Sequence, residues 1–308
     1  MHPLIKRILA RLLSALLVLW LAASTAFVAI HALPGKIEDV LAGDLQYPGL
    51  REAISAQWGL DRSLAWQYGH FLERLAHGDL GSSYVMQQDV IQVLSSQIWP
   101  TVQLALSAGV LATVLALVVA TLTAGRSRLS RRLASAVELI LASTPVFWLG
   151  LLLLIAFSFQ WRLFPVSGAT GWKSLVLPAV TLALPLAGVL SQVTREALEQ
   201  ALEQAFVTTI RARGLGELAL RLRHLLRHAL LPVVTLGGWL IGSLLGGAVI
   251  TEKMFGRPGV GSVTLNAVLS QDLPVVLAVV LLAALIHVVI STLLDVLYLF
   301  IDPRLNTP

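Results

Sequence analysis

The sequence predicts an all-α membrane protein with six transmembrane helices, and three observations support this fold class. First, 56% of the 308 residues are hydrophobic and 13% are charged, whereas about a quarter of the residues in a soluble domain are charged. Second, the hydrophobic residues gather in runs of about 20, the length of helix that crosses the hydrocarbon core of a bilayer. Third, the basic residues are shared unequally between alternate connections, as the positive-inside rule requires.

Six hydrophobic stretches are long enough to cross a membrane. The fourth contains Pro178 and Pro185, which membrane helices tolerate where neighbouring helices satisfy the freed carbonyl groups. The first follows a basic N-terminus and contains small residues at 22–26, as a signal peptide does. Its apolar sequence continues to Ile30, however, and favours an uncleaved anchor. The expected spans are 8–30, 101–123, 133–159, 175–194, 232–251 and 275–300.

The basic residues predict the orientation of these spans. Most of the 22 lysines and arginines lie on the same side as the N-terminus, so both termini are expected in the cytoplasm. This topology accounts for the net charge of +5, and the charge therefore gives no reason to expect a nucleic-acid partner. The chain is expected to comprise an N-terminal tail with the first helix (1–31), a long extracytoplasmic loop region (32–100) and a core of five transmembrane helices (101–308).

The connection at about 195–231 is an unusually long inner loop. Its first part, 196–209, is rich in helix-forming residues, and Gly214 and Gly216 interrupt the helix. A second, basic stretch follows, with an amphipathic pattern. This pattern alone is compatible with a helix lying among anionic lipid headgroups and with a surface that docks a protein. The expected apolar face is Leu218, Leu222, Leu225 and Leu226, with Arg221, Arg223 and Arg227 on the other faces.

This inner loop resembles the cytoplasmic coupling loop of binding-protein-dependent ABC importer permeases of the peptide/nickel branch. The matching elements are Ala212-Arg213-Gly214, the basic residues 224–227 and Ala229-Leu230-Leu231-Pro232-Val233-Val234. The wider superfamily places Glu-Ala-Ala ahead of the glycine, whereas this chain has Thr208, Thr209 and Ile210 there. The acidic residue of that motif is therefore missing.

Other segments resemble the same branch, in the same order along nearly the whole chain. In the outer loop these are the Leu-Gly-Leu-Asp-like, Gln-Tyr and Gly-Asp-Leu-Gly-x-Ser elements, and further along they are proline- and glycine-containing segments. The matching residues are Trp58-Gly59-Leu60-Asp61, Gln67-Tyr68, 77–83, 144–150, 164–168, 252–261 around Phe255, Pro258 and Gly259, and Asp302-Pro303-Arg304.

The resemblance implies a multi-pass subunit of the bacterial inner membrane that forms half of a translocation path for peptides or a related small solute, such as a nickel or metal chelate. It implies four kinds of partner: a second homologous permease, two cytoplasmic ABC ATPases, an extracytoplasmic solute-binding protein and membrane lipid. ATP and Mg would be used by the ATPases, with no cofactor bound by this chain. The implied ATPase-coupling residues are Thr208, Thr209, Ile210, Arg211, Ala212, Arg213, Gly214, Leu215 and Gly216.

Motifs for chemistry in the chain itself are missing from the sequence. The nearest approach to a phosphate-binding loop is 168–174, in which Trp172 separates glycine from lysine. The sequence has no cysteine, which excludes disulfides, thiolate metal sites and cysteine nucleophiles. His224 and His228 are four residues apart but belong to the basic stretch, and no metal site is expected there. We therefore expect no catalytic or metal-binding residues.

Two features of the spans leave alternatives open. His287 and Asp295 lie in the sixth expected span, where ionisable groups serve proton relays or bond neighbouring helices. A self-sufficient secondary transporter that uses this pair is therefore the alternative function. In the fifth span, Gly238, Gly242 and Gly246 repeat at every fourth position, which permits close helix packing. They could pack inside the subunit, form the seam with a second permease or line the pore.

Overall fold

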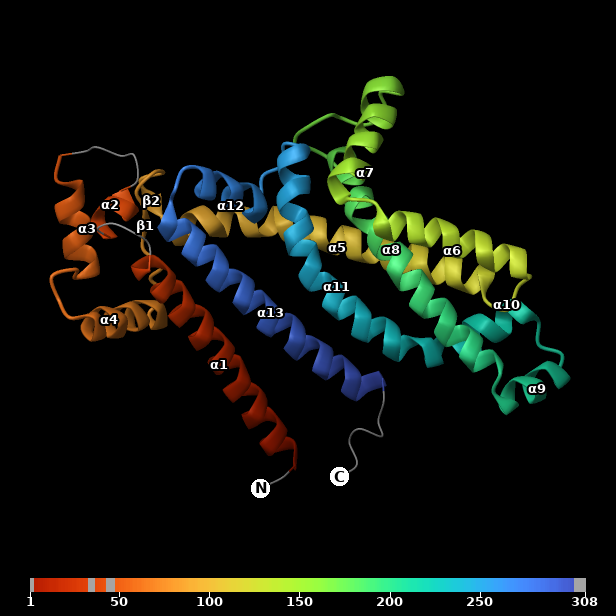
Figure 1. The fold of residues 1–308 in the computed structure, drawn as a ribbon. Coiled ribbons are helices and arrows are strands. Elements are labelled where there is room, and N and C mark those ends of the chain that lie inside the picture. Colours follow the sequence, from red (N-terminus) through yellow and green to blue (C-terminus); the bar gives the residue numbers. More distant parts are fainter. Residues whose placement is uncertain (1–2, 33–36, 43–47, 302–308) are drawn as a thin grey trace. The chain divides into compact units, whose positions relative to one another are not determined.

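The computed structural model describes residues 3–32, 37–42 and 48–301, which are mostly helical (Figure 1). Helices are expected in a bilayer because their backbone N–H and C=O groups are satisfied within one segment. The elements are α1 (Pro3–His31), α2 (Ile37–Ala42), α3 (Leu50–Trp58), α4 (Leu64–Ala76), β1 (Ser82–Ser83), β2 (Gln88–Asp89), α5 (Val90–Thr123), α6 (Arg128–Ser143), α7 (Val146–Leu153), η1 (Leu154–Gln160), α8 (Lys173–Leu202), α9 (Ala205–Ala212), α10 (Glu217–Leu220), η2 (Arg221–Leu225), α11 (Leu226–Met254), α12 (Val260–Leu269) and α13 (Leu273–Ile301), where η1 and η2 are π-helical.

Four described helices, α1, α5, α8 and α13, are long and apolar enough to cross a membrane, and a bent pair of helices raises the number to five. The four correspond to the first, second, fourth and sixth expected spans, and α8 continues through Pro178 and Pro185. The fifth expected span lies inside α11, which is 29 residues long but is not among these candidates. The structure thus supports a helical membrane protein with four or five candidate spans.

The third expected span is not a single straight helix. Helix α6 and the segment Val146–Gln160 meet at an angle of 103°, with Thr144 and Pro145 at the break. Proline cannot donate a backbone hydrogen bond, and it disfavours the helical conformation of the residue before it. The expectation of one helix over 133–159 was therefore wrong at this point.

The chain divides into two compact units, Met1–Trp99 with Gly259–Val289, and Pro100–Pro258 with Ile290–Pro308. In the first unit, α1 packs against α4. The Phe27 ring lies 5.2 Å from that of Tyr68, and the Tyr68 hydroxyl is 2.6 Å from Ser24 Oγ. One turn further along α1, His31 Nε2 lies 3.0 Å from Gln67 Oε1. The Gln67-Tyr68 element therefore ties α4 to α1.

A buried carboxyl group connects β1 to the start of α13 in the same unit. Asp272 is 1% exposed and accepts a hydrogen bond from Ser83 Oγ. Burial raises the pKa of Asp272 above its ordinary value of 3.8. The unfolded chain therefore loses this proton at a lower pH than the folded chain does. Asp272 consequently reduces the free energy of unfolding as the pH rises from 3.8 through its folded pKa.

We expect the substitution Asp272→Asn to weaken the fall in stability with rising pH, because it removes a group that ionises unfavourably in the folded state. The melting temperature of the detergent-solubilised protein across this pH range is the measurement. Asp79→Asn is the matched control, because Asp79 changes the stability with pH in the opposite direction. A hydrogen bond from Arg74 lowers the pKa of Asp79, so that carboxylate stabilises the fold above pH 3.8 and loses this effect on acidification. Parallel pH profiles for Asp272→Asn and the wild type would contradict the expectation.

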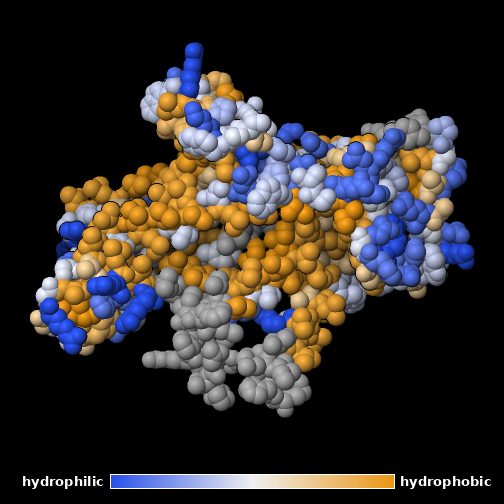
Figure 2. Space-filling model, turned by 180° about the vertical axis from the view of Figure 1, so that it is seen from behind, coloured by the Kyte–Doolittle hydropathy of each residue, from blue (hydrophilic) through white to orange (hydrophobic). Residues whose placement is uncertain are grey.

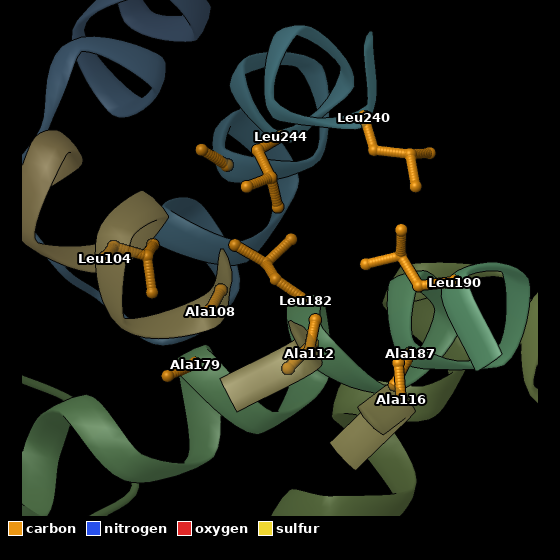
Figure 3. Packing of buried hydrophobic residues seen from close by; sticks show 12 residues of the cluster. Leu104, Ala108, Ala112, Ala116, Ala179, Leu182, Ala187, Leu190, Leu240 and Leu244 are labelled. Carbon is orange, nitrogen blue, oxygen red and sulfur yellow. The ribbon is translucent and has the colours of Figure 1, made fainter. Parts of the chain in front are cut away.

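Alanines on one face of α5 let three helices of the second unit approach closely (Figure 3). Ala108, Ala112 and Ala116 recur at every fourth position and are fully or almost fully buried. Small side chains favour helix contacts in a membrane, where apolar side chains gain little by leaving lipid. The cluster is completed by Leu104 of α5, by Ala179, Leu182, Ala183, Ala187 and Leu190 of α8, and by Leu240, Leu244 and Ala248 of α11.

The other face of α5 carries large exposed apolar side chains, at Leu106, Val110, Val114 and Val118. Figure 2 shows that hydrophobic side chains cover long continuous areas of the surface, whereas hydrophilic ones gather in separate patches. Continuous apolar areas of this kind are rare on soluble monomers. Lipid or another hydrophobic surface therefore covers this face.

Helix α6 packs closely against α8 at Gly188. A Cβ atom at Gly188 would lie 2.7 Å from the carbonyl oxygen of Glu138. We expect Gly188→Ala to destabilise the protein by about 1–3 kcal/mol, because the contact is with rigid backbone. Gly109→Ala is the control, since a Cβ atom there meets nothing within 4 Å. Melting temperatures in detergent distinguish the two substitutions, and an unchanged value for Gly188→Ala would contradict this packing.

Candidate functional site

The loop expected at about 195–231 folds into short helices that follow α8. Helix α8 continues to Leu202, and Glu203 and Gln204 separate it from α9. The single helix expected at 196–209 is therefore interrupted. After α9 the chain turns at Gly214, whose φ of +77° favours glycine. Gly216 has an ordinary φ of −66° and precedes α10.

Helix α9 is anchored on one side and exposed on the other. Val207 is buried in a cluster with residues of α5, α8 and the following loop, and Phe206 and Ile210 pack against this cluster. The other buried members are Ala120, Ala124, Leu198, Ala201, Leu220 and Leu225. Seven of the nine coupling residues implied by the resemblance are exposed, while Ile210 and Leu215 are half-buried. The exposed residues are Thr208, Thr209, Arg211, Ala212, Arg213, Gly214 and Gly216.

An ion pair spans the glycine turn and joins α9 to α10. Arg211 Nε donates to Glu217 Oε1 at 2.8 Å, and a second guanidinium nitrogen lies 3.3 Å from Oε2. This bidentate bond lowers the pKa of Glu217 below its ordinary value. Gly214 N also donates to the carbonyl oxygen of Arg211 at 2.9 Å. The turn is thus held by both backbone and side-chain bonds, while its outer surface remains open.

The prediction of an apolar face in the second basic stretch is only partly correct. Leu225 is fully buried as expected, but Leu218 and Leu222 are 54% and 53% exposed, and Leu220 is buried instead. Arg221, expected on a polar face, is 4% exposed. The π-helical turn η2 begins at Arg221 and breaks the 3.6-residue period on which the expectation was based.

Arg221 connects this stretch to the end of α5. Its Nη1 donates to the carbonyl oxygen of Thr121 at 3.0 Å, in the last turn of that helix. A cation there satisfies an otherwise unpaired carbonyl group and lies at the negative end of the helix dipole. The anchored α9 and Arg221 therefore both attach the loop to α5.

A buried ion pair between α6 and α8 was missed by the sequence reasoning. Arg195 Nη1 and Nη2 donate to the two carboxylate oxygens of Glu138 at 2.6 and 2.7 Å. Ser191 and Ser135 complete the network, because Ser191 Oγ donates to Glu138 and Ser135 Oγ accepts from Arg195. Glu138 lies within the third expected span, so its acidic side chain in an apolar run was the available signal.

The 252–261 segment, which carries part of the resemblance, fixes the opposite end of α5, α8 and α11. Glu252 is fully buried and accepts a hydrogen bond from Thr101 Oγ1 of α5. Arg257 is buried and donates to the carbonyl oxygen of Ser174 in α8 at 3.2 Å. Burial lowers the pKa of Arg257 from its ordinary value. This segment therefore positions helices and presents no open reactive group among these residues.

The remaining candidates are not brought together as one site. His287 is exposed, and Asp295 is half-buried eight residues further along α13. Of the three glycines, Gly238 lies against Leu294 of α13, whereas Cβ atoms at Gly242 and Gly246 would meet nothing within 4 Å. No group of three His, Cys, Asp or Glu in the described ranges could hold a metal ion. Asp302-Pro303-Arg304 lies outside the described residues.

These features define a multi-pass helical membrane protein that presents a short anchored helix on the long loop between α8 and α11. The chain belongs to the family described as "Binding-protein-dependent transport system inner membrane component", whose model matches residues 112–307. A second model, for the N-terminal part of such membrane components, matches residues 4–105. The resemblance noted in the sequence is thereby confirmed.

Curated relatives extend this finding over nearly the whole chain. The glutathione transport system permease protein GsiC of Escherichia coli K12 is 33% identical over 97% of this chain and 98% of its own length. The Shigella flexneri serotype 5b protein of the same name is 32% identical over the same shares. A chain of the MetNI methionine ABC transporter, solved in inward-facing conformations, has the same fold with a TM-score of 0.54. It is 18% identical and aligns with 69% of this chain and 97% of its own length.

The chain is therefore a permease subunit of a binding-protein-dependent ABC importer of the bacterial inner membrane. In this class the ATPase is a separate subunit. The comparisons give no support to the alternative of a self-sufficient transporter that uses His287 and Asp295.

Proposed function

We propose that this chain forms half of a translocation path for a small peptide such as glutathione, together with a second homologous permease. Two cytoplasmic ATPases bind beneath the pair and use ATP and Mg, and an extracytoplasmic binding protein delivers the solute. The solute class comes from the name of the relatives, and their match over 97% of this chain supports the assignment of the same class to this chain. Uptake of labelled glutathione and of a labelled dipeptide, with and without this chain, tests the solute.

We further propose that residues 208–216 contact one ATPase. The observation that carries this proposal is that α9 is anchored through Val207 to the cluster with α5 and α8 while its opposite face is exposed. A rigid anchored helix transmits displacement, whereas a loose loop would absorb it. The same proposal includes six spans, with both termini and α9 in the cytoplasm and the region 32–100 outside, because basic residues concentrate in the inner connections.

Introduced thiols can test both the proposed orientation and the proposed ATPase contact, because the chain has no cysteine of its own. In this cysteine-free chain, Thr209→Cys and Arg62→Cys each introduce one exposed thiol. A membrane-impermeant maleimide should label Arg62→Cys on intact spheroplasts and Thr209→Cys only on inside-out vesicles. The reverse pattern would contradict the orientation.

The same thiols report on the ATPase contact. Addition of the ATPase subunits should protect Thr209→Cys from labelling. Arg126→Cys, an exposed position in the turn between α5 and α6, is the control that should remain reactive. Equal labelling of Thr209→Cys with and without the ATPases would exclude α9 as the contact.

A further inference from the structure

A groove of about 620 Å³ lies between α6 and α8, which pack side by side (Figure 1). It is formed by the first half of α6 and the last third of α8, beside the Glu138–Arg195 ion pair. It is distinct from the exposed surface of α9. Its lining residues are Arg128, Arg131, Arg132, Ser135, Gln192, Arg195, Glu196 and Glu199.

Charges in the groove are only partly compensated. Arg195 is bound by Glu138, and Arg131 lies 3.4 Å from Glu199. Arg128 and Arg132 make no ion pair within the described residues, and they are neighbours on one face of α6 because they are four positions apart. Glu196 is the other acid of the lining and is exposed. The N-terminal end of α6, where Arg128 is the first residue, adds the positive end of a helix dipole.

Two buried polar atoms of groove-lining residues indicate what kind of ligand the groove accepts. Arg131 Nε and Glu199 Oε1 are buried and make no hydrogen bond with the described residues. The first needs an acceptor and the second needs a donor, and a buried polar group without a partner is costly. A ligand that satisfies both carries an anionic acceptor and a hydroxyl donor within a few ångströms of each other.

The surroundings of the groove indicate an amphipathic ligand. Leu129, Leu133, Val137 and Ile140 form an exposed apolar stripe on the neighbouring face of α6. Leu139 is also exposed, one turn beyond Ser135 on the face of the groove itself. Gly188 closes the far end, where α8 touches the backbone of α6. A headgroup in the groove would therefore have its apolar tails beside this stripe.

We propose that this groove binds the headgroup of an anionic phospholipid whose phosphodiester carries a hydroxyl-bearing alcohol, as in phosphatidylglycerol. The phosphate accepts from Arg128, Arg132 and Arg131 Nε, and the headgroup hydroxyl donates to Glu199. Basic pockets between membrane helices commonly bind such headgroups. The inference goes beyond the transport function. Assignment to the inner leaflet rests on the proposed orientation, whereas the headgroup site itself does not.

Native mass spectrometry of the purified complex, titrated with phosphatidylglycerol in detergent, tests this site. One lipid per chain should be retained, and Arg128→Gln with Arg132→Gln should weaken retention about thirty-fold, since each basic group contributes about a factor of five. Arg223→Gln with Arg227→Gln removes the same charge outside the groove and should leave retention unchanged. Lysine at 128 and 132 should retain most of the affinity.

Three comparisons identify the ligand chemistry. Phosphatidylcholine should be retained weakly, because it has no net negative charge, and phosphatidylmethanol should bind less tightly than phosphatidylglycerol, because it lacks the hydroxyl. Glycerol 3-phosphate, a soluble ion without acyl chains, should not displace the lipid. Unchanged retention in the Arg128/Arg132 variant, or equal retention of phosphatidylcholine, would overturn the proposal. Displacement by glycerol 3-phosphate would instead identify a site for soluble phosphates, and equal binding of phosphatidylmethanol would refute the role of Glu199.

Discussion

The substitution Gly214→Val is expected to abolish ATP-driven uptake while the chain still inserts and folds in the membrane. Gly214 has a φ of +77°, a conformation that is strained for a β-branched residue. Valine would displace the turn and separate Arg211 from Glu217, so the exposed surface of α9 would lose its shape. The interior of the bundle does not contact Gly214, since a Cβ atom there would meet nothing within 4 Å.

Gly216 provides the matched control for this prediction. It lies two residues away, has the same free space, and has a φ of −66° that any residue adopts. Although Gly216 belongs to the proposed ATPase contact, Gly216→Val leaves the turn at Gly214 intact and should therefore retain more uptake and more ATPase binding than Gly214→Val. Both variants should show wild-type amounts in the membrane by immunoblot. Full uptake and ATPase binding by Gly214→Val would remove the turn from the coupling mechanism.

The second large effect is expected at the buried ion pair between α6 and α8. Arg195→Leu leaves the Glu138 carboxylate buried, at 2% exposure, without its cation. Removal of one partner from a buried pair costs about 3–5 kcal/mol. The solubilised protein should therefore lose most of its thermal stability, or fail to accumulate in the membrane.

The double substitution Glu138→Leu with Arg195→Leu separates the charge effect from the loss of packing. Replacement of a complete buried pair by apolar side chains is often neutral or stabilising, so the double variant should recover stability that Arg195→Leu loses. Ser135 and Ser191 can then bond to carbonyl groups of their own helices. Arg223→Leu, at an exposed position, should have no effect. A double variant as unstable as Arg195→Leu would show that volume and not charge is decisive there.

Sequence reasoning located four of the six expected spans as long apolar helices, because their signal is local. A run of apolar residues predicts a span wherever it occurs, and Pro178 and Pro185 did not interrupt α8. The break at Pro145 carried the same local signal as those prolines, and sequence gave no means of telling them apart. The difference lies in whether neighbouring helices satisfy the freed carbonyl groups, which depends on the tertiary arrangement.

The candidate site was predictable as a segment but not in its contacts. The glycines and the basic pattern located the loop, whereas the burial of Arg221 required the carbonyl oxygen of Thr121, 100 residues earlier in the chain. The pairing of Glu138 with Arg195 likewise spans 57 residues. Contacts of this kind depend on which helix faces meet, and no periodicity within a single segment encodes that.

The attachment of the loop to α5 has a mechanical consequence. Helix α5 has 34 residues and is therefore about 50 Å long. A rigid helix of this length can transmit a displacement at Thr121 over a distance greater than the thickness of a hydrocarbon core. Pro100 lies inside this helix, at the boundary between the two compact units. Loss of one backbone hydrogen bond at proline softens a helix locally. A displacement received at α9 would thus be carried along α5 from Thr121 to Pro100, where the helix is softened.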